Sequence, residues 1–393
     1  MTPIPLTLQT LYQDLLQAHL DRAPEEMSGA PHLRKIGGRK FWYASARAPG
    51  GAHRQIFIGP DDAPTRARIR RWRGAREDAR VFRAASSEKA AALRAARLPA
   101  LDMTTGKTLR ALAEAGAFRL GAVLVGTHPF RLYDLELGAR ISSTASLTAG
   151  IDVAFSPLPL AGEGSGERGR DAASAFALGG DREKSVHDTT ENRRATEPSP
   201  LSPLPLAGEG DAYRESATNA EIERAHRRAQ PLLPEVLASL GFSPVRNRPT
   251  RWRMGEFVVD FLAPSFDEKE GPQKLEALGL WAQGLHFLNF LIRDPIPAVA
   301  LYREGVLVQI PRPERFAVHK LIVAARRRGP GRAKAEKDLA QSRALIAALA
   351  EARPRELKTA HDEAVDEGPA WRKTIAASLK RAPELGDLLD GLD

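Results

Sequence analysis

The sequence contains no cysteine. This absence excludes disulfide frameworks, thiolate zinc sites and cysteine nucleophiles. The sequence also lacks any run of about 18 apolar residues, the length that a helix needs to cross a bilayer, so we expect no membrane-spanning segment. The residues after Met1 lack the basic segment, apolar core and small-residue cleavage site of a secretory signal. These absences together predict a cytoplasmic protein that has no membrane partner.

The chain has 393 residues, of which 42% are hydrophobic, which suffices for two or three domains that each bury a core. Its formal net charge is +9. Residues 31–73 contain eleven lysines and arginines against two acidic residues, Asp61 and Asp62. This window alone accounts for the excess of positive charge, so we expect any binding of an anionic partner to involve it.

Residues 1–95 are predicted to form an N-terminal helix, a basic aromatic sheet of three strands and a basic helix. The helix prediction rests on an apolar stripe at helical spacing, formed by Leu8, Leu11, Tyr12, Leu15 and Leu16. Three runs rich in aromatic and β-branched residues follow, separated by Gly37-Gly38 and by Pro49-Gly50-Gly51, which favours a small antiparallel sheet.

Basic and aromatic residues alternate in this region, as in "GRKFWY" and "TRARIRRWRGAREDARVFR". Such a mixture suits phosphate contacts and base stacking, so Arg68, Arg70 and Arg71 are candidates for binding RNA or DNA. The alternative is a solvated charged face over a small aromatic core, because charge alone specifies no ligand.

Residues 96–155 begin a second unit. A helix capped by a threonine is predicted to start at Thr104 and to end at Gly116. The apolar run "AVLV" then leads into Gly126-Thr127 and a helix that carries Pro129 in its first turn. His128 is expected at the surface or as a helix cap. The run "TAGIDVAF", residues 148–155, is the next predicted strand.

Residues 156–215 are predicted to form a disordered insertion. The segment "SPLPLAGEG" occupies 156–164 and recurs at 202–210, and the residues between are polar, charged and aperiodic. Two copies without apolar faces do not build a repeat architecture, and so polar a segment offers too little apolar surface to offset its ordering entropy. An identical repeated nonapeptide resembles a translated mobile DNA repeat.

Periodic patterns resume after the insertion. Residues 216–330 contain predicted helices and strands, including the strand "GEFVVDFLAP" and the helix "PERFAVHKLIVAARRR", and we expect them to complete the domain begun at residue 96. Residues 331–393 are predicted to form a helical tail. Within it, Lys337 and Asp338 are expected to stabilise their helix through local charge pairs.

Asp152 and Asp260 are the candidate metal ligands. Metal-assisted phosphoryl transfer needs carboxylates that converge on cations, and residues two apart on a strand share a face about 6.6 Å apart. Asp152 holds the second position of such a pair, but Gly150 holds the first, and Asp260 would come from a neighbouring strand. Glu256 lies four residues before Asp260, about 13 Å along a strand, which is too far to replace the missing carboxylate.

The order strand, Gly-Thr, helix, strand with Asp, helix, strand with Asp resembles the polymerase-beta-like nucleotidyltransferase superfamily. The segments "LVGTHPFRLYDLELGARI", "TAGIDVAF" and "RWRMGEFVVDFLAP" are similar to a bacterial family of nucleotidyltransferase-fold proteins. The resemblance implies that Gly126 and Thr127 hold the triphosphate of a nucleotide and that Asp152 and Asp260 bind Mg²⁺. It also places Lys320 near the nucleotide, the alternative being a solvated lysine.

Two residues depart from the pattern of this family, which has Gly or Ser at the position of Thr127 and Asp or Glu at the position of Gly150. Losing one well-placed electrostatic group lowers an enzymatic rate by about 10²–10³. We therefore expect an α+β protein with a nucleotidyltransferase-like mixed sheet and flanking helices, preceded by the small antiparallel region and followed by the helical tail. Its expected activity is a weakened transfer of a nucleoside monophosphate from a nucleoside triphosphate to an unknown acceptor. The alternative is a catalytically inactive protein that binds a nucleotide or a nucleic acid.

Overall fold

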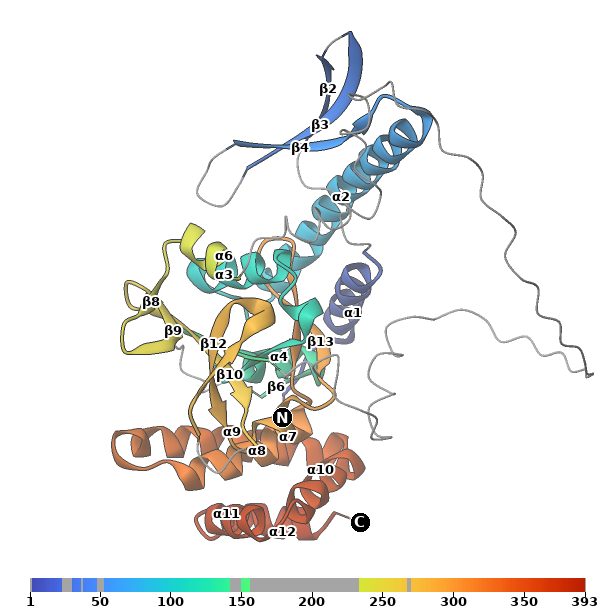
Figure 1. Ribbon diagram of the computed structural model, residues 1–393. Helices are drawn as coiled ribbons and strands as arrows, with labels where there is room; N and C mark the ends of the chain where they lie inside the picture. The colour runs from blue at the N-terminus through green and yellow to red at the C-terminus, as the bar shows by residue number, and fades with distance from the viewer. Residues whose placement is uncertain are drawn as a thin grey trace, which may run out of the picture. The chain divides into compact units, whose positions relative to one another are not determined.

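The computed structural model describes residues 2–22, 30–36, 38–47, 53–141, 150–155, 233–266 and 270–392. These residues belong to one compact unit. The predicted insertion at 156–215 lies outside them. The described residues combine a mixed sheet with small antiparallel sheets and helices, which confirms the predicted α+β class (Figure 1).

A three-stranded antiparallel sheet follows the first helix, as predicted. Helix α1 spans Leu6–Leu20, and the strands are β2 (Ala30–Ile36), β3 (Arg39–Arg47) and β4 (His53–Pro60), in the order β2-β3-β4. Helix α2, Ala63–Ala95, begins at Asp62, whose side chain accepts the Thr65 N–H. Trp42, Ala44 and Ile58 of the sheet pack with Trp72 of α2. Helix α2 also contacts α1.

The larger sheet has seven strands, of which five form the path β11-β12-β10-β7-β5, while β9 pairs with β10 and β8 with β9. Strand β7 runs parallel to β10 and antiparallel to β5, so the sheet is mixed. The strands are β5 (Ala122–Val125), β7 (Gly150–Phe155), β8 (Ser243–Val245), β9 (Arg248–Met254), β10 (Phe257–Pro264), β11 (Pro272–Leu275) and β12 (Leu280–Leu285).

Short helices and two further strand pairs surround this sheet. The helices are α3 (Met103–Glu114), α4 (Thr127–Glu136), α6 (Leu233–Ser239), α7 (Leu288–Ile292) and the 3-10 turns η1 (Phe118–Leu120) and η2 (Glu276–Leu278). The strand pairs join β1 (Thr2–Pro3) to β6 (Ala139–Arg140) and β13 (Ile296–Ala300) to β14 (Val306–Ile310).

The cap of α3 differs from the prediction. Asp102, and not Thr104, caps this helix, and its carboxylate accepts the N–H groups of Thr104 and Thr105 at 3.0 Å. An aspartate at this position satisfies two unpaired donors and also carries the negative charge that the helix dipole favours.

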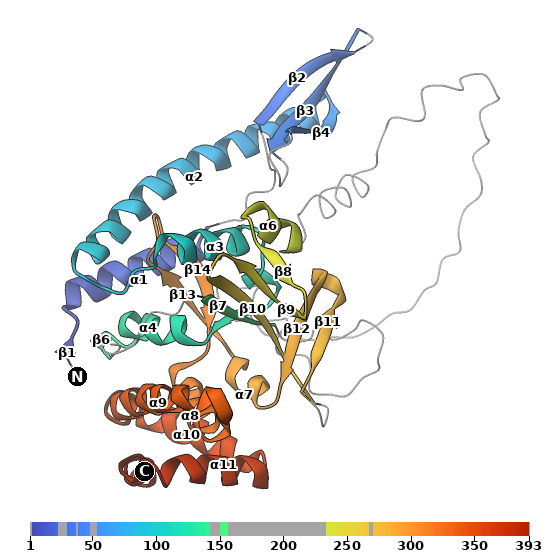
Figure 2. The same cartoon turned by 90° about the vertical axis from the view of Figure 1, so that its left-hand side faces the viewer.

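The helical tail predicted for residues 331–393 is confirmed. It contains α9 (Ala333–Ala352), α10 (Pro354–Asp366), α11 (Pro369–Leu379) and α12 (Pro383–Asp390). The helix α8 (Pro313–Arg326) and the 3-10 turn η3 (Gly329–Arg332) come before it in the chain. Helix α8 contacts α9, α10 and α11, and these helices lie together in both views (Figures 1 and 2). Among the described residues no helix is long and apolar enough to span a bilayer.

Helix α8 is fixed beside α4 by buried aromatic side chains. Phe316 of α8 stacks on Phe130 and meets the edge of Tyr133, both in α4. The Tyr133 hydroxyl donates to the Pro311 carbonyl at 2.8 Å, which satisfies its buried polar group. These contacts hold the polar residues of α8 and α9 next to the start of α4.

Candidate functional site

The turn between β5 and α4 requires a glycine for two reasons. Gly126 has φ 79° and ψ −138°, a conformation that residues with a side chain rarely adopt. The Asp152 carboxylate also lies against its α-carbon, in the space that a Cβ atom would fill. No side chain caps α4, so the N–H groups of its first turn and the helix dipole favour a phosphate there.

Asp152 and Asp260 face each other across two neighbouring parallel strands. Asp152 of β7 pairs in register with Asp260 of β10, which puts both side chains on one face of the sheet, on strands whose backbones are about 4.8 Å apart. Burial and, second, the negative charge of Asp260 together raise the pKa of Asp152 to about 6. The sequence therefore predicted correctly that these two aspartates meet.

Arg251 is a third member of this site, and the sequence reasoning missed it. It lies on β9 directly opposite Asp260, and its Nε and one terminal nitrogen donate to the two carboxylate oxygens at 2.6 and 2.7 Å. A signal was present in the sequence, because Gly255 and Glu256 form a two-residue turn. Arg251 lies three residues before the end of β9 at Met254, and Asp260 lies three residues after the start of β10 at Phe257. A two-residue turn between the strands therefore places Arg251 opposite Asp260.

Lys320 is buried, with 8% of its surface exposed, so the alternative of a solvated lysine is wrong. Its Nζ donates to Asp338 at 2.7 Å and lies 5.1 Å from the centre of the Phe316 ring. The positive charge of Lys320 opposes the rise in the pKa of Asp152, which indicates that the two groups lie near each other. The structure thus brings Lys320 to the aspartates.

The predicted local pairing of Asp338 within its own helix is wrong. Asp338 accepts from Lys320 and, at 2.9 Å, from Arg327, both of which lie outside its own helix. Burial opposes the ionisation of Asp338, but the attraction of Lys320 and then of Arg327 lowers its pKa overall. Lys337 points instead to α4, where its Nζ donates to Thr127 Oγ1 at 3.3 Å. Lys334, one turn before Lys337 on α9, carries a positive charge that lowers the pKa of Asp152.

Positive charge therefore exceeds negative charge around the start of α4. Burial lowers the pKa of Lys337, and the neighbouring charge of Lys320 lowers it further, as expected where cations crowd together. Three carboxylates face five cationic side chains in this network: Arg251, Lys320, Arg327, Lys334 and Lys337. Such an arrangement attracts a polyanion.

Gly150 leaves no room for a side chain. A Cβ atom built on it would lie 2.6 Å from Val258 Cγ2 and 2.8 Å from the Val258 carbonyl oxygen. His128 of α4 also contacts β7 at Gly150, because its Nε2 donates to the Gly150 carbonyl at 2.9 Å. The expectation that His128 lies at the surface or caps α4 is wrong, since only 4% of its surface is exposed.

The described residues contain no group of three or more histidines, aspartates and glutamates that could hold a metal ion. Glu256 lies in the turn before β10 and brings no third carboxylate to the pair. A cation at this site would therefore have Asp152 and Asp260 as its protein carboxylates.

Arg68, Arg70 and Arg71 lie on α2, next to the three-stranded sheet. Arg70 and Arg71 are exposed and Arg68 is partly buried. They belong to a different surface from the aspartates, whose charged neighbours come from β9, α8 and α9.

A family model described as "Nucleotidyltransferase" matches residues 103–190 and 215–366. The matched segments include the turn at Gly126, both aspartates and the lysines of α8 and α9, whereas the N-terminal sheet and α2 precede them. The match leaves residues 191–214 between its two segments, as expected for a domain interrupted by an insertion. A search of curated proteins and a search of solved structures each found no match.

Proposed function

Because the chain belongs to the nucleotidyltransferase family, we propose that it binds a nucleoside triphosphate beside Asp152 and transfers the nucleoside monophosphate to an acceptor hydroxyl. The observation that carries this proposal is the pairing of Asp152 with Asp260 in register, directly against Gly126. Family and superfamily resemblance had predicted the same pair from sequence.

The phosphates are assigned to the start of α4. The uncapped first turn offers N–H donors, and Thr127 adds a hydroxyl. Lys337 already donates to that hydroxyl, so a phosphate bound there would meet its ammonium group as well. Lys320 and Lys334 add positive charge from α8 and α9. The excess of cations offsets the repulsion that Asp152 and Asp260 exert on a triphosphate.

The two aspartates fit one divalent cation. Asp152 and Asp260 lie side by side, and the raised pKa of Asp152 reflects a carboxylate that a cation would stabilise. They do not fit a pair of metal ions, because Gly150 supplies no ligand and Arg251 already binds both oxygens of Asp260. An ionised carboxylate has about four lone-pair sites, so Asp260 keeps two beside its bonds to Arg251, and with Asp152 it would hold one Mg²⁺. The chemistry of this cation would be to neutralise the charge of the reacting phosphate.

The proposed transfer is a substitution at the α-phosphorus. The acceptor oxygen forms a bond to this phosphorus, the bond to the bridging oxygen of the β-phosphate breaks, and pyrophosphate leaves while the hydroxyl proton passes to water. The residues of α4, α8 and α9 orient the triphosphate and stabilise its charge. With one carboxylate fewer than the family pattern, the rate is expected to be about 10²–10³ lower.

The second candidate is nucleotide binding without transfer. The close approach of Val258 to Gly150 and the pairing of Arg251 with Asp260 favour it, since both reduce the number of ligands for a metal ion. The phosphate contacts are common to the two candidates, so binding alone does not separate them.

Incubation with each of the four α-labelled nucleoside triphosphates separates the candidates, with Mg²⁺ or Mn²⁺ present and cellular RNA or protein as acceptor. We expect slow transfer of label by the unaltered protein and by Asp387→Asn, an exposed control on α12, and none by Asp260→Asn. Binding of nucleotide without transfer of label supports the second candidate. Absence of both binding and transfer contradicts the proposal.

A further inference from the structure

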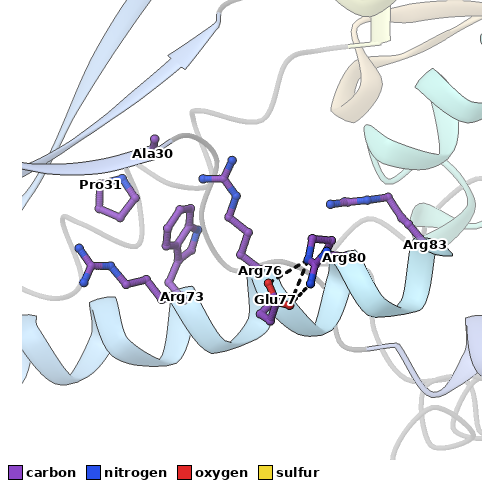
Figure 3. A pocket seen from close by; sticks show the side chains of 8 residues that line it. Ala30, Pro31, Arg73, Arg76, Glu77, Arg80 and Arg83 are labelled. Atoms are coloured by element: carbon purple, nitrogen blue, oxygen red, sulfur yellow. Dashed lines mark hydrogen bonds and ion pairs between the residues drawn. The ribbon is translucent and has the colours of Figure 1, made fainter. Parts of the chain in front are cut away.

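A basic hollow lies between β2 and α2, outside the segments that match the family model (Figure 3). Its volume is about 440 Å³, and it is lined by Ala30, Pro31, Trp72, Arg73, Arg76, Glu77, Arg80 and Arg83. Glu77 is the one acidic residue in this lining, and its carboxylate is bound to Arg80. The lining therefore has a net positive charge.

The four arginines lie on successive turns of one helix face. Arg73, Arg76, Arg80 and Arg83 are three or four residues apart, and Figure 3 shows Ala30 and Pro31 across from them. Like charges at this spacing repel one another and destabilise a helix, and the single carboxylate of Glu77 offsets only one of the four charges. From first to last they cover about 15 Å of helix, so a strand that follows this face would meet several of them.

Two of these arginines lie over tryptophan rings. The Arg76 guanidinium lies 5.3 Å from the centre of the Trp72 ring, and that of Arg73 lies 5.8 Å from the centre of the Trp42 ring. Trp42 and Trp72 pack against the cluster of Ala44 and Ile58, between the sheet and α2, so the rings are fixed in place. Guanidinium and indole groups that lie together offer a nucleic-acid base a planar surface for stacking, and the guanidinium also offers N–H donors to a phosphate.

We propose that this hollow binds single-stranded nucleic acid. The arginines contact the phosphates, and bases of an unpaired strand stack on the guanidinium and indole groups. A hollow of this volume is in the range of sites for one small ligand, which suits a nucleotide unit and not the width of a duplex. Arg70 and Arg71, chosen from sequence, are exposed but do not line it.

Two charge-matched double variants test the proposal in the full-length protein. Arg73→Gln with Arg76→Gln removes two charges from the hollow, and Arg70→Gln with Arg71→Gln removes two from elsewhere on the same helix. All four side chains are exposed, so both variants should fold, and thermal unfolding followed by circular dichroism checks this. The probes are fluorescein-labelled 12-mers of single-stranded RNA and DNA and a 12-base-pair duplex, without nucleotide, measured at several salt concentrations.

We expect the hollow variant to bind the better single strand at least tenfold more weakly than the control variant. The slope of log affinity against log salt should fall by about 1.4 for the two lost phosphate contacts. A preference for RNA or for DNA identifies the natural strand. Equal losses in both variants, tighter binding of the duplex, equally tight binding of poly-glutamate, or no binding at low salt would each overturn the proposal. None of these outcomes depends on nucleotidyl transfer.

Discussion

Replacing Asp152 with asparagine is expected to stabilise the folded protein above pH 6. Burial raises the pKa of this carboxyl to about 6, helped by the charge of Asp260, whereas in the unfolded chain it ionises near 3.9. Between these values the folded state keeps a proton that the unfolded chain has lost. The free energy of unfolding therefore falls as pH rises from about 4 to about 6, and stays reduced above that.

The size of the effect follows from the difference between the two pKa values. It is about two pH units at 1.36 kcal/mol per unit, or about 3 kcal/mol. Asparagine carries no charge at any pH, so Asp152→Asn should gain up to about 3 kcal/mol over the unaltered protein at pH 8 and nothing near pH 4. Asp152 reduces the stability of the fold where it is ionised, so its presence is explained by function and not by folding.

Urea unfolding at pH 4, 6 and 8 measures this difference. Tryptophan fluorescence is a suitable signal because Trp252 is 8% exposed in β9, where it pairs with Val259 of β10. The exposed control Asp387→Asn should change the free energy of unfolding by less than about 0.5 kcal/mol at each pH. A loss of stability in Asp152→Asn at pH 8, or an equal gain at pH 4 and pH 8, would refute the reasoning.

Three further substitutions test the surroundings of the site. Gly126→Ala should abolish nucleotide binding, because its methyl group would displace the Asp152 carboxylate. The control is Gly121→Ala, at a glycine with φ 88° and open space around it. It should cost about 1–2 kcal/mol of stability and leave nucleotide binding intact. Asp338→Asn should lower the urea-unfolding free energy by about 3–5 kcal/mol at pH 7, because it leaves a buried lysine unpaired, and by less as pH falls through the low pKa of this carboxyl. Glu384→Gln, which breaks an exposed pair of equal length, should leave the free energy of unfolding almost unchanged. Gly150→Asp should lower the free energy of unfolding by about 1–3 kcal/mol through overpacking, and it should not restore label transfer to a normal rate. A fully active and fully stable variant would show that the strands can separate there.

The meeting of Asp152 and Asp260 could be predicted from sequence because it depends on short-range patterns. Each aspartate sits in an apolar run of strand length, and the Gly-Thr turn and the helix that precede Asp152 fix the order of the elements. The three-stranded N-terminal sheet was predictable for the same reason, since glycine and proline residues mark its turns.

The remaining contacts depend on register and on helix rotation, which sequence patterns do not fix. Arg251 reaches Asp260 only because β9 pairs with β10 in one register. Asp338 turns toward α8 because of how α8 and α9 pack, whereas its position in a charged helix suggested local pairs. Gly150 lacks space for a side chain because the backbone of β10 at Val258 lies close to it. The sequence pattern does not specify that distance.

The central claim is that the start of α4 and the lysines of α8 and α9 form a triphosphate site beside the paired aspartates. Calorimetric titration with a non-hydrolysable nucleoside triphosphate tests it most directly in the unaltered protein, in Lys337→Gln and in Lys358→Gln, an exposed control on α10. We predict that Lys337→Gln weakens binding about tenfold or more, the loss of one charge-assisted phosphate contact, and that the control binds as the unaltered protein does. Equal affinities for all three proteins would contradict the claim.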